Sequence, residues 1–133
     1  MWKTSKAMLV IFSLLCASFL TSCQKSDQNE DASIAIETYL QALVARDFNK
    51  MVNSSCAPWE GQAKVEFDSF TAVKLELSNL ACKETGQQNN TKLVSCNGTI
   101  IANYGAEDLE INIADRTYRA TQEGGEWRMC GYQ

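Results

Sequence analysis

Histidine is absent from this chain of 133 residues, and proline occurs once. Without an imidazole, the chain cannot build a Ser-His-Asp or Cys-His catalytic site, nor a zinc site that uses histidine. Basic residues are also few, since 12 Lys and Arg stand against 16 Asp and Glu. This acidic balance argues against nucleic acid as a partner, because phosphate binding needs a basic surface. The remaining composition, 45% apolar and 21% charged, is typical of one globular domain with appendages.

The N-terminus has the organisation of an export signal. Lys3 and Lys6 supply positive charge, and an uncharged apolar run follows from 7 to 20. As a helix, this run of about 14 residues spans about 21 Å, which is shorter than the roughly 30 Å hydrocarbon core of a membrane. We therefore interpret it as the apolar part of a signal peptide rather than as a permanent membrane span.

The end of this run, Leu20-Thr21-Ser22-Cys23, resembles the lipobox of bacterial lipoproteins. The resemblance implies that a diacylglycerol is joined to the Cys23 thiol, that the chain is cut before Cys23, and that a fatty acid such as palmitate acylates the new amino group. It implies a lipid-anchored, extracytoplasmic protein at the cell membrane or the outer membrane, with the bilayer as its partner. The alternatives are an ordinary cleaved signal peptide and an uncleaved anchor, in which Cys23 has no such role.

A polar stretch separates the signal from the rest of the chain. Residues 24–32 contain no large apolar side chain and predict a flexible tether, which extends at most about 30 Å. Cleavage before Cys23 would leave 10 basic residues against 16 acidic ones, so anionic headgroups would repel the protein and the acyl chains would hold it. We divide the chain into a signal peptide (1–22), the lipidated cysteine with its tether (23–32) and one domain (33–133).

The domain begins with the hydrophobic period of helices and continues with that of strands. Apolar residues from 33 to 53 follow the i, i+4, i+7 spacing of one helix face, with a bend expected near Arg46 and Asp47. A second helix is predicted over Pro58–Phe70, since proline suits the first helical turn. Alternating segments then predict antiparallel strands over 73–83, 92–104, 109–113, 117–121 and 127–132, with a tight hairpin at 123–126. This order predicts an α+β domain.

Four cysteines lie in the predicted domain: Cys56, Cys82, Cys96 and Cys130. They permit three pairings. If the first two strands form a hairpin that turns near Asn89, Cys82 lies opposite Cys96 at a β-carbon distance suited to a disulfide. Cys56 is then left to join Cys130. The alternative, a redox or metal site, would need a Cys-x-x-Cys spacing or histidine, so we predict structural disulfides with no metal and no cofactor.

Two stretches resemble the NTF2-like (cystatin-like α+β cone) superfamily. Residues 39–47, which read Tyr-Leu-Gln-Ala-Leu and then Arg-Asp, are similar to its first-helix pattern, and residues 118–132 are similar to its final hairpin, in which a Gly turn precedes Trp127. More narrowly, the chain is similar to small bacterial lipoproteins that carry one such domain. The resemblance covers 33–133 and implies N-terminal helices packed on a curved antiparallel sheet. It also implies a ligand site inside the cone, for which Tyr39, Trp59 and Tyr104 are the expected lining residues.

The superfamily contains isomerases and dehydratases as well as non-catalytic binding modules. Known enzymes of the fold place a His, or an Asp with a Tyr, in the cone. Because histidine is absent, we expect a non-catalytic module without catalytic residues, which binds a small ligand or an envelope protein. The alternative is an isomerase, dehydratase or hydrolase that uses an Asp-Tyr pair, with Asp47, Asp68, Tyr39 and Tyr104 as candidates. In simpler roles, Asp47 ends or kinks the first helix and Tyr39 packs against the sheet.

The sequence leaves two further interactions undecided, one with an anion and one with another protein through the sheet. Arg116 and Arg119 can bind an anion, or they can be solvated or paired with acids such as Glu123. An exposed apolar sheet face would favour an envelope-assembly protein, and a homodimer through the sheet, as in many NTF2-like domains, is a further prediction.

Overall fold

Helices come first and strands second, as the change of hydrophobic period predicts. The computed structural model describes residues 31–133. In chain order the elements are α1 (Ala32–Val44), α2 (Phe48–Asn53), the 3-10 turn η1 (Ala57–Trp59), α3 (Glu60–Ser69), β1 (Lys74–Gln88), β2 (Thr91–Asn103), β3 (Asp108–Asn112), the 3-10 turn η2 (Ile113–Asp115), β4 (Thr117–Glu123) and β5 (Glu126–Tyr132). The signal peptide, Cys23 and residues 24–30 of the predicted tether lie outside the described residues. Within 31–133, no helix has the length and apolar character needed to cross a membrane.

The first helix begins earlier than the predicted domain boundary at 33. Asp31 caps α1, because its side chain accepts a hydrogen bond of 3.1 Å from the Ser33 N–H. Ala32, assigned to the tether from the sequence, is fully buried as the first residue of this helix. The domain therefore also includes Asp31 and Ala32, which precede the predicted boundary.

The bend predicted near Arg46 and Asp47 is a complete break between α1 and α2. Arg46 has a φ of 60°, in the left-handed region that ends helices. Asp47 then caps α2, accepting a hydrogen bond of 3.0 Å from the Lys50 N–H. The Arg46 guanidinium donates to the Phe67 carbonyl at 2.9 Å, which fixes this corner to α3.

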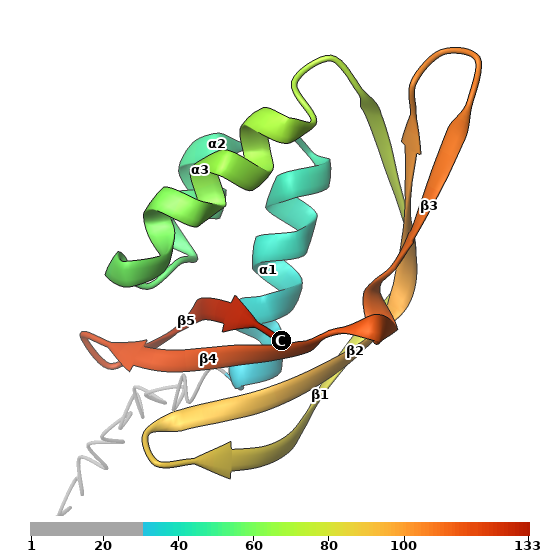
Figure 1. The fold of residues 1–133 in the computed structure, drawn as a ribbon. Coiled ribbons are helices and arrows are strands. Elements are labelled where there is room, and N and C mark those ends of the chain that lie inside the picture. Colours follow the sequence, from blue (N-terminus) through green and yellow to red (C-terminus); the bar gives the residue numbers. More distant parts are fainter. Residues whose placement is uncertain (1–30) are drawn as a thin grey trace, which may run out of the picture.

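The helices lie on one side of a strongly curved antiparallel sheet (Figure 1). The strand order is β1-β2-β4-β5, and β3 also pairs with β2. The long strand β2 therefore has two partners on one edge: β4 pairs with its first half and β3 with its second half. This arrangement confirms the predicted α+β class, with N-terminal helices on a curved sheet.

The sheet bends where β1 and β2 lose their regular register. Gly98 lies in the middle of β2 with a φ of 131°, and a β-carbon there would approach the Ser78 carbonyl to 2.9 Å. Opposite it, β1 has a register shift between Ser78 and Ala81, and Asn79 has a φ of 55°. A bulge of this kind increases the twist and bends the strand. The bend lets one continuous sheet curl around the helices.

The first hairpin is longer than predicted. β1 runs to Gln88 instead of ending near 83, because residues 86–88 continue to pair with the start of β2. Only Asn89 and Asn90 form the turn, and Asn89 has a φ of 53°. Asparagine tolerates this left-handed conformation better than most residues. The prediction of a turn near Asn89 is confirmed, and the predicted end of the first strand at 83 is wrong.

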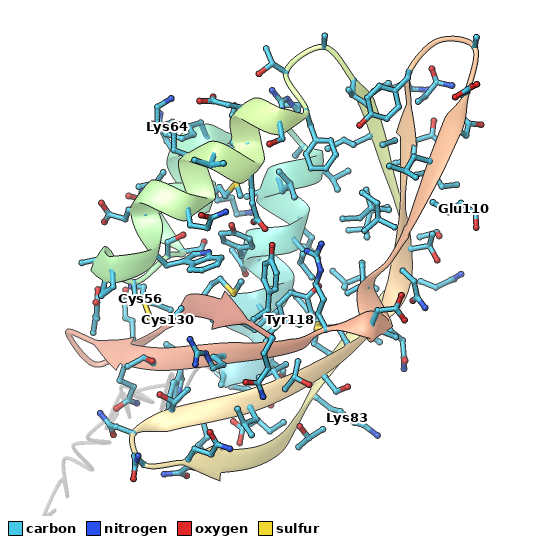
Figure 2. All side chains as sticks on the ribbon, in the orientation of Figure 1. Cys56, Lys64, Lys83, Glu110, Tyr118 and Cys130 are labelled. Carbon is cyan, nitrogen blue, oxygen red and sulfur yellow. A yellow bond between two sulfur atoms is a disulfide. The ribbon has the colours of Figure 1, made fainter. Side chains whose placement is uncertain are left out.

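The two faces of the sheet differ in polarity. The core lies between the helices and the inner face of the sheet and includes these fully buried large side chains: Ile36, Tyr39, Met51, Val94, Cys96, Ile113, Tyr118 and Met129. On the outer face, Lys74 pairs with Glu76 at 2.7 Å, and Figure 2 shows Lys83 and Glu110 pointing away from the helices. This face is charged along β1 and β3. A homodimer through the sheet stays a prediction, and it would have to bury these charges.

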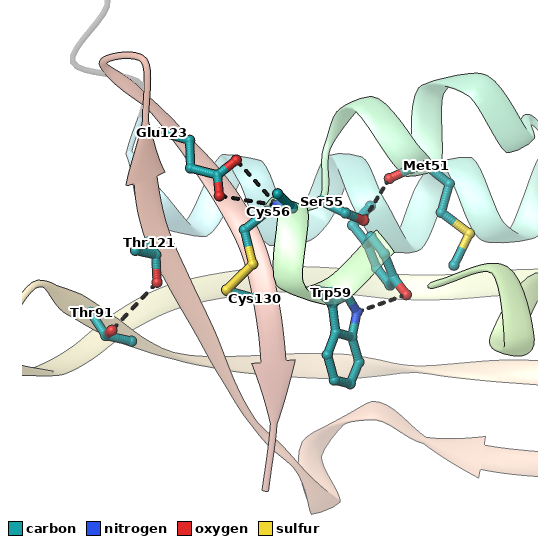
Figure 3. The surroundings of a disulfide bond; sticks show 10 residues. Met51, Ser55, Cys56, Trp59, Thr91, Thr121, Glu123 and Cys130 are labelled. Carbon is teal, nitrogen blue, oxygen red and sulfur yellow. Dashed lines mark hydrogen bonds between the residues drawn. A yellow bond between two sulfur atoms is a disulfide. The ribbon is translucent and has the colours of Figure 1, made fainter. Parts of the chain in front are cut away.

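Both predicted disulfides are confirmed. Cys82 and Cys96 are register partners on β1 and β2, and the two Cα atoms are 4.0 Å apart. Cys56 joins Cys130 over a sequence separation of 74 residues, with the Cα atoms 5.3 Å apart (Figure 3). The backbone of Cys56 also donates to the Met129 carbonyl at 2.8 Å. The second bridge therefore fastens the segment before α3 to the edge strand β5.

Candidate functional site

A cavity of about 270 Å³ lies between α1, α3 and the inner face of the sheet. It is lined by these residues: Tyr39, Leu40, Leu43, Gln62, Val65, Glu66, Ser69, Phe70, Ile100, Ile111, Ile113, Arg116, Tyr118 and Tyr132. Most of its wall is aliphatic or aromatic, and its charged groups are one carboxylate and one guanidinium. Apolar walls with a few convergent polar groups are typical of small-molecule sites.

The helix α3 brings one face to this cavity. Gln62, Val65, Glu66 and Ser69 follow the i, i+3, i+4, i+7 spacing and all line it. Glu66 lies between the turns that hold the buried Ala63 and the partly buried Phe70, so its carboxylate is carried inward with the apolar stripe. The side chain of Glu66 is only 13% exposed.

Two tyrosines hold the Glu66 carboxylate from opposite elements. The Tyr39 hydroxyl, from α1, donates to Glu66 Oε2 at 2.5 Å. The Tyr132 hydroxyl, from β5, donates to Glu66 Oε1. Trp59 extends the network, because its indole N–H donates to the Tyr39 hydroxyl oxygen at 3.2 Å (Figure 3). Each carboxylate oxygen therefore accepts one tyrosine proton, which satisfies a largely buried charge.

Arg116 completes the polar end of the cavity. Its Nη1 atom lies 4.0 Å from Glu66 Oε1, and its guanidinium carbon lies 4.2 Å from the centroid of the Tyr132 ring. The Arg116 side chain is 38% exposed, so it faces both the cavity and solvent. Arg116 and Glu66 together make this end of the cavity charged but electrically neutral.

The tyrosines of the cavity are held in their protonated form. Burial, with a further contribution from the Glu66 charge, raises the pKa of Tyr39 far above its ordinary value. Burial also raises the pKa of Tyr118 to about 12, against a smaller opposite effect of Arg116. Burial and the Glu66 hydrogen bond raise the pKa of Tyr132 to about 12. At neutral pH these hydroxyls are therefore hydrogen-bond donors and not bases.

Of the three residues predicted to line a ligand site, only one lines the cavity. Tyr39 lines the cavity. Trp59 is partly buried and does not line the cavity, but it contacts two residues that do. Its indole N–H donates to Tyr39, and its ring centroid lies 5.6 Å from that of Tyr132. Tyr104 is 54% exposed and does not line the cavity, in contrast to the expectation from the sequence. The physical reason is that β2 ends at Asn103, so Tyr104 belongs to the turn, where its N–H donates to the Glu107 carbonyl at 2.9 Å.

The aspartates proposed for an Asp-Tyr pair do not reach the cavity either. Asp47 is exposed and caps α2. Asp68 is exposed and forms an ion pair of 2.7 Å with Lys64 on the solvent side of α3. Neither side chain is a candidate base for a reaction in this cavity. The carboxylate that meets tyrosines there is Glu66. It is not among the residues predicted from the sequence, although its i+3 spacing from Ala63 places it beside the apolar stripe.

The remaining charged candidates have separate roles. Arg119 is exposed on β4, whereas Arg116 lies at the cavity. Glu123 accepts hydrogen bonds of 3.0 and 3.2 Å from the Ala57 N–H, one with each carboxylate oxygen, and so holds the start of η1 (Figure 3). Within residues 31–133, no three His, Cys, Asp or Glu side chains gather in a way that could hold a metal ion.

Comparison with known proteins gives likenesses of structure only. No protein-family model and no curated protein sequence matches the chain. The solved structures that are similar to it include three described below. A SEC-C motif containing protein from Rhodopseudomonas palustris has 15% identity and a TM-score of 0.49, with 77% of this chain and 78% of that chain covered. A protein of the NTF2-like family from Streptomyces avermitilis has 12% identity and a TM-score of 0.47, with 75% of this chain and 90% of that chain covered.

The third similar structure is the helical cell shape determining protein Pgp2 from Campylobacter jejuni, with 11% identity and a TM-score of 0.49. The match covers 74% of this chain and 38% of that chain. At these identities the likenesses concern the fold alone, and the α+β class follows from the described elements themselves.

Proposed function

We propose that this protein is a lipid-anchored bacterial lipoprotein whose extracytoplasmic domain binds a small, mainly apolar ligand without catalysis. The observation that carries the binding role is the cavity of about 270 Å³ between the helices and the sheet. Its apolar wall favours an apolar ligand, and its few polar groups can orient that ligand. Two disulfides in so small a domain support export to an oxidising compartment.

The Glu66 carboxylate supports a binding role as a fixed hydrogen-bond acceptor. Each of its oxygens accepts one tyrosine proton and keeps a second lone pair for a ligand. The raised pKa values of the tyrosines keep their hydroxyls protonated at neutral pH. The group therefore supplies a fixed, polar end to the cavity.

An enzyme is the second candidate. The observation that favours it is a carboxylate and two tyrosines in one cavity, a set that can move protons in an isomerase, dehydratase or hydrolase. It differs from the Asp-Tyr pair expected from the sequence, since the carboxylate is Glu66. Recovery of a chemically altered ligand after incubation with the protein would favour this candidate over simple binding.

The anchor is tested by incorporation of labelled palmitate in bacterial cells. We expect the wild-type chain and a Cys16→Ala control to be labelled equally, since Cys16 lies within the signal. Cys23→Ala should carry no label. Equal labelling of all three chains would contradict lipidation at Cys23.

The binding role is tested with toluene, a small apolar probe, and isoleucine methyl NMR of the full chain in lipid nanodiscs. We expect toluene to shift the methyl signals of Ile100 and Ile113, which line the cavity, but not that of the exposed Ile34. Val65→Trp places a large ring at an exposed position of the cavity wall and should weaken the shifts. Lys64→Trp, one position away and outside the wall, is the matched control. Absence of cavity shifts in the wild-type chain would overturn the proposed function.

A further inference from the structure

The polar end of the cavity contains a gap of defined size. Arg116 Nη1 and Glu66 Oε1 are 4.0 Å apart. A direct N–H···O hydrogen bond has a heavy-atom distance of about 2.7–3.2 Å, so the two groups do not form one. An oxygen atom about 2.8 Å from both, a normal hydrogen-bond length, lies about 2 Å to the side of the line that joins them. One oxygen at such a position bridges the two side chains.

The chemistry of the two side chains decides what that oxygen must be. A guanidinium only donates hydrogen bonds, and an ionised carboxylate only accepts them. The bridging atom must accept from Arg116 and donate to Glu66, which a hydroxyl does. A ketone or ether oxygen can accept from Arg116 but has no proton to donate to Glu66 Oε1, which accepts from Tyr132 and keeps a second lone pair. A ligand hydroxyl can also replace a bridging water without loss of hydrogen bonds.

Charge excludes the two other simple polar groups. A ligand carboxylate would be attracted by Arg116 but repelled by Glu66, which is only 13% exposed. A ligand ammonium would be attracted by Glu66 but repelled by Arg116. The charges of Glu66 and Arg116 balance, so a neutral group loses no Coulomb energy at this end of the cavity.

The rest of the cavity sets the size and character of the ligand. Leu43, Ile100 and Ile113 belong to the apolar wall. The cavity of about 270 Å³ is near the lower end of the volumes of small-molecule sites, which suits a small ligand. A ligand of this size has a short aliphatic or ring body and one polar group.

We propose that the cavity selects a neutral alcohol whose hydroxyl bridges Arg116 and Glu66 and whose aliphatic body packs against the isoleucine and leucine wall. The assignment rests on the proposed ligand-binding function and names the chemical class of its ligand. The specificity is set by the balance of the two charged side chains, so removal of either charge changes the preferred ligand.

The test compares 1-hexanol, hexanoate and hexylamine, which share one aliphatic body. Each is titrated into the full chain in lipid nanodiscs, and binding is read from the methyl signals of Ile100, Ile111 and Ile113, with the exposed Ile34 as the internal control. For the wild-type chain we expect 1-hexanol to bind about tenfold more tightly than either charged probe.

Substitution of each charge should reverse this order. With Arg116→Gln, Glu66 is uncompensated and hexylamine, as its ammonium, should become the tightest probe. With Glu66→Gln, Arg116 is uncompensated and hexanoate should become the tightest. Arg119→Gln, a loss of the same charge at an exposed position three residues further along the chain, should leave the wild-type order unchanged.

The outcomes separate the inference from the proposed function. If toluene and the hexyl probes shift the cavity signals but the order of the three probes is the same in the wild-type chain and in Arg116→Gln, the alcohol assignment is wrong and the ligand cavity stands. If no probe shifts the cavity signals of the wild-type chain, the binding function itself is wrong. Because Arg116 is partly exposed, Arg116→Gln decides the matter even if Glu66→Gln does not fold.

Discussion

The Tyr39 hydroxyl donates a hydrogen bond of 2.5 Å to Glu66 Oε2 and so joins α1 to α3 across 27 positions of the sequence. The same carboxylate accepts from Tyr132 on the last strand. One acidic side chain thus connects two helices and the sheet at the rim of the cavity. The arrangement shapes the candidate site and also stabilises the fold.

The first prediction concerns this hydrogen bond. Tyr39→Phe should lower the free energy of unfolding by about 1.5–3 kcal/mol, the usual value for a bond to a charged group. Tyr104→Phe removes the same atom from an exposed ring and should change stability by less than about 0.5 kcal/mol. Urea denaturation of both variants measures the difference. Equal effects would mean that the Tyr39 bond contributes nothing specific.

The second prediction concerns pH. The pKa values of Tyr118 and Tyr132 are raised from 10.0 in the unfolded reference to about 12 in the folded state. The folded chain therefore retains these protons longer than the unfolded chain does. Their contribution to stability is complete below about pH 10 and is lost as the pH rises toward about 12.

Chemical denaturation at about pH 9 and about pH 11 should therefore give a lower free energy of unfolding at the higher pH. Tyrosinate absorbance of the folded protein should rise later than that of the unfolded chain. The variant Tyr118→Phe should show a smaller fall in stability between the two pH values. A stability that rises over this interval would contradict the assignment.

The third prediction compares the disulfides. The Cys56–Cys130 bridge closes a loop with a sequence separation of 74, and the Cys82–Cys96 bridge one of 14. On the chain-entropy model, the loss of the long bridge costs about 4–4.5 kcal/mol and the loss of the short one about 3 kcal/mol. The paired Cys→Ser variants are compared by thermal and urea unfolding. We expect the Cys56/Cys130 pair to be the less stable, and the reverse order would contradict the model.

The fourth prediction concerns the bend of the sheet. Gly98→Ala forces a β-carbon within 2.9 Å of the Ser78 carbonyl at a φ of 131°, so it should destabilise the protein by about 1–3 kcal/mol. Gly61→Ala, in α3, meets no atom within 4 Å and should stabilise it by about 0.5 kcal/mol. Thermal unfolding of the two variants gives opposite shifts if the bend requires glycine. Similar shifts would show that it does not.

Local patterns in the sequence were sufficient for the secondary structure and the disulfides. The change from helical period to alternation separates the helices from the strands, because each period places apolar side chains on one face. The Cys82–Cys96 pair follows from hairpin register, which a short turn determines. With that pair made, only Cys56 and Cys130 remained. The secondary structure and the first disulfide depend on residues that are close in sequence. The second disulfide follows because two cysteines of the domain are left.

The candidate site depended on contacts that no local pattern specifies. Glu66 and Tyr132 are 66 positions apart, and Arg116 reaches the same carboxylate from the position between η2 and β4. Periodicity shows that a side chain lies near the buried face, but it does not show which residue lies opposite on another element. Tyr104 was misplaced for a related reason, since its position depends on where β2 ends. The sequence by itself therefore determined the elements and their covalent links, whereas the curvature of the sheet over the helices decided which polar groups meet in the cavity.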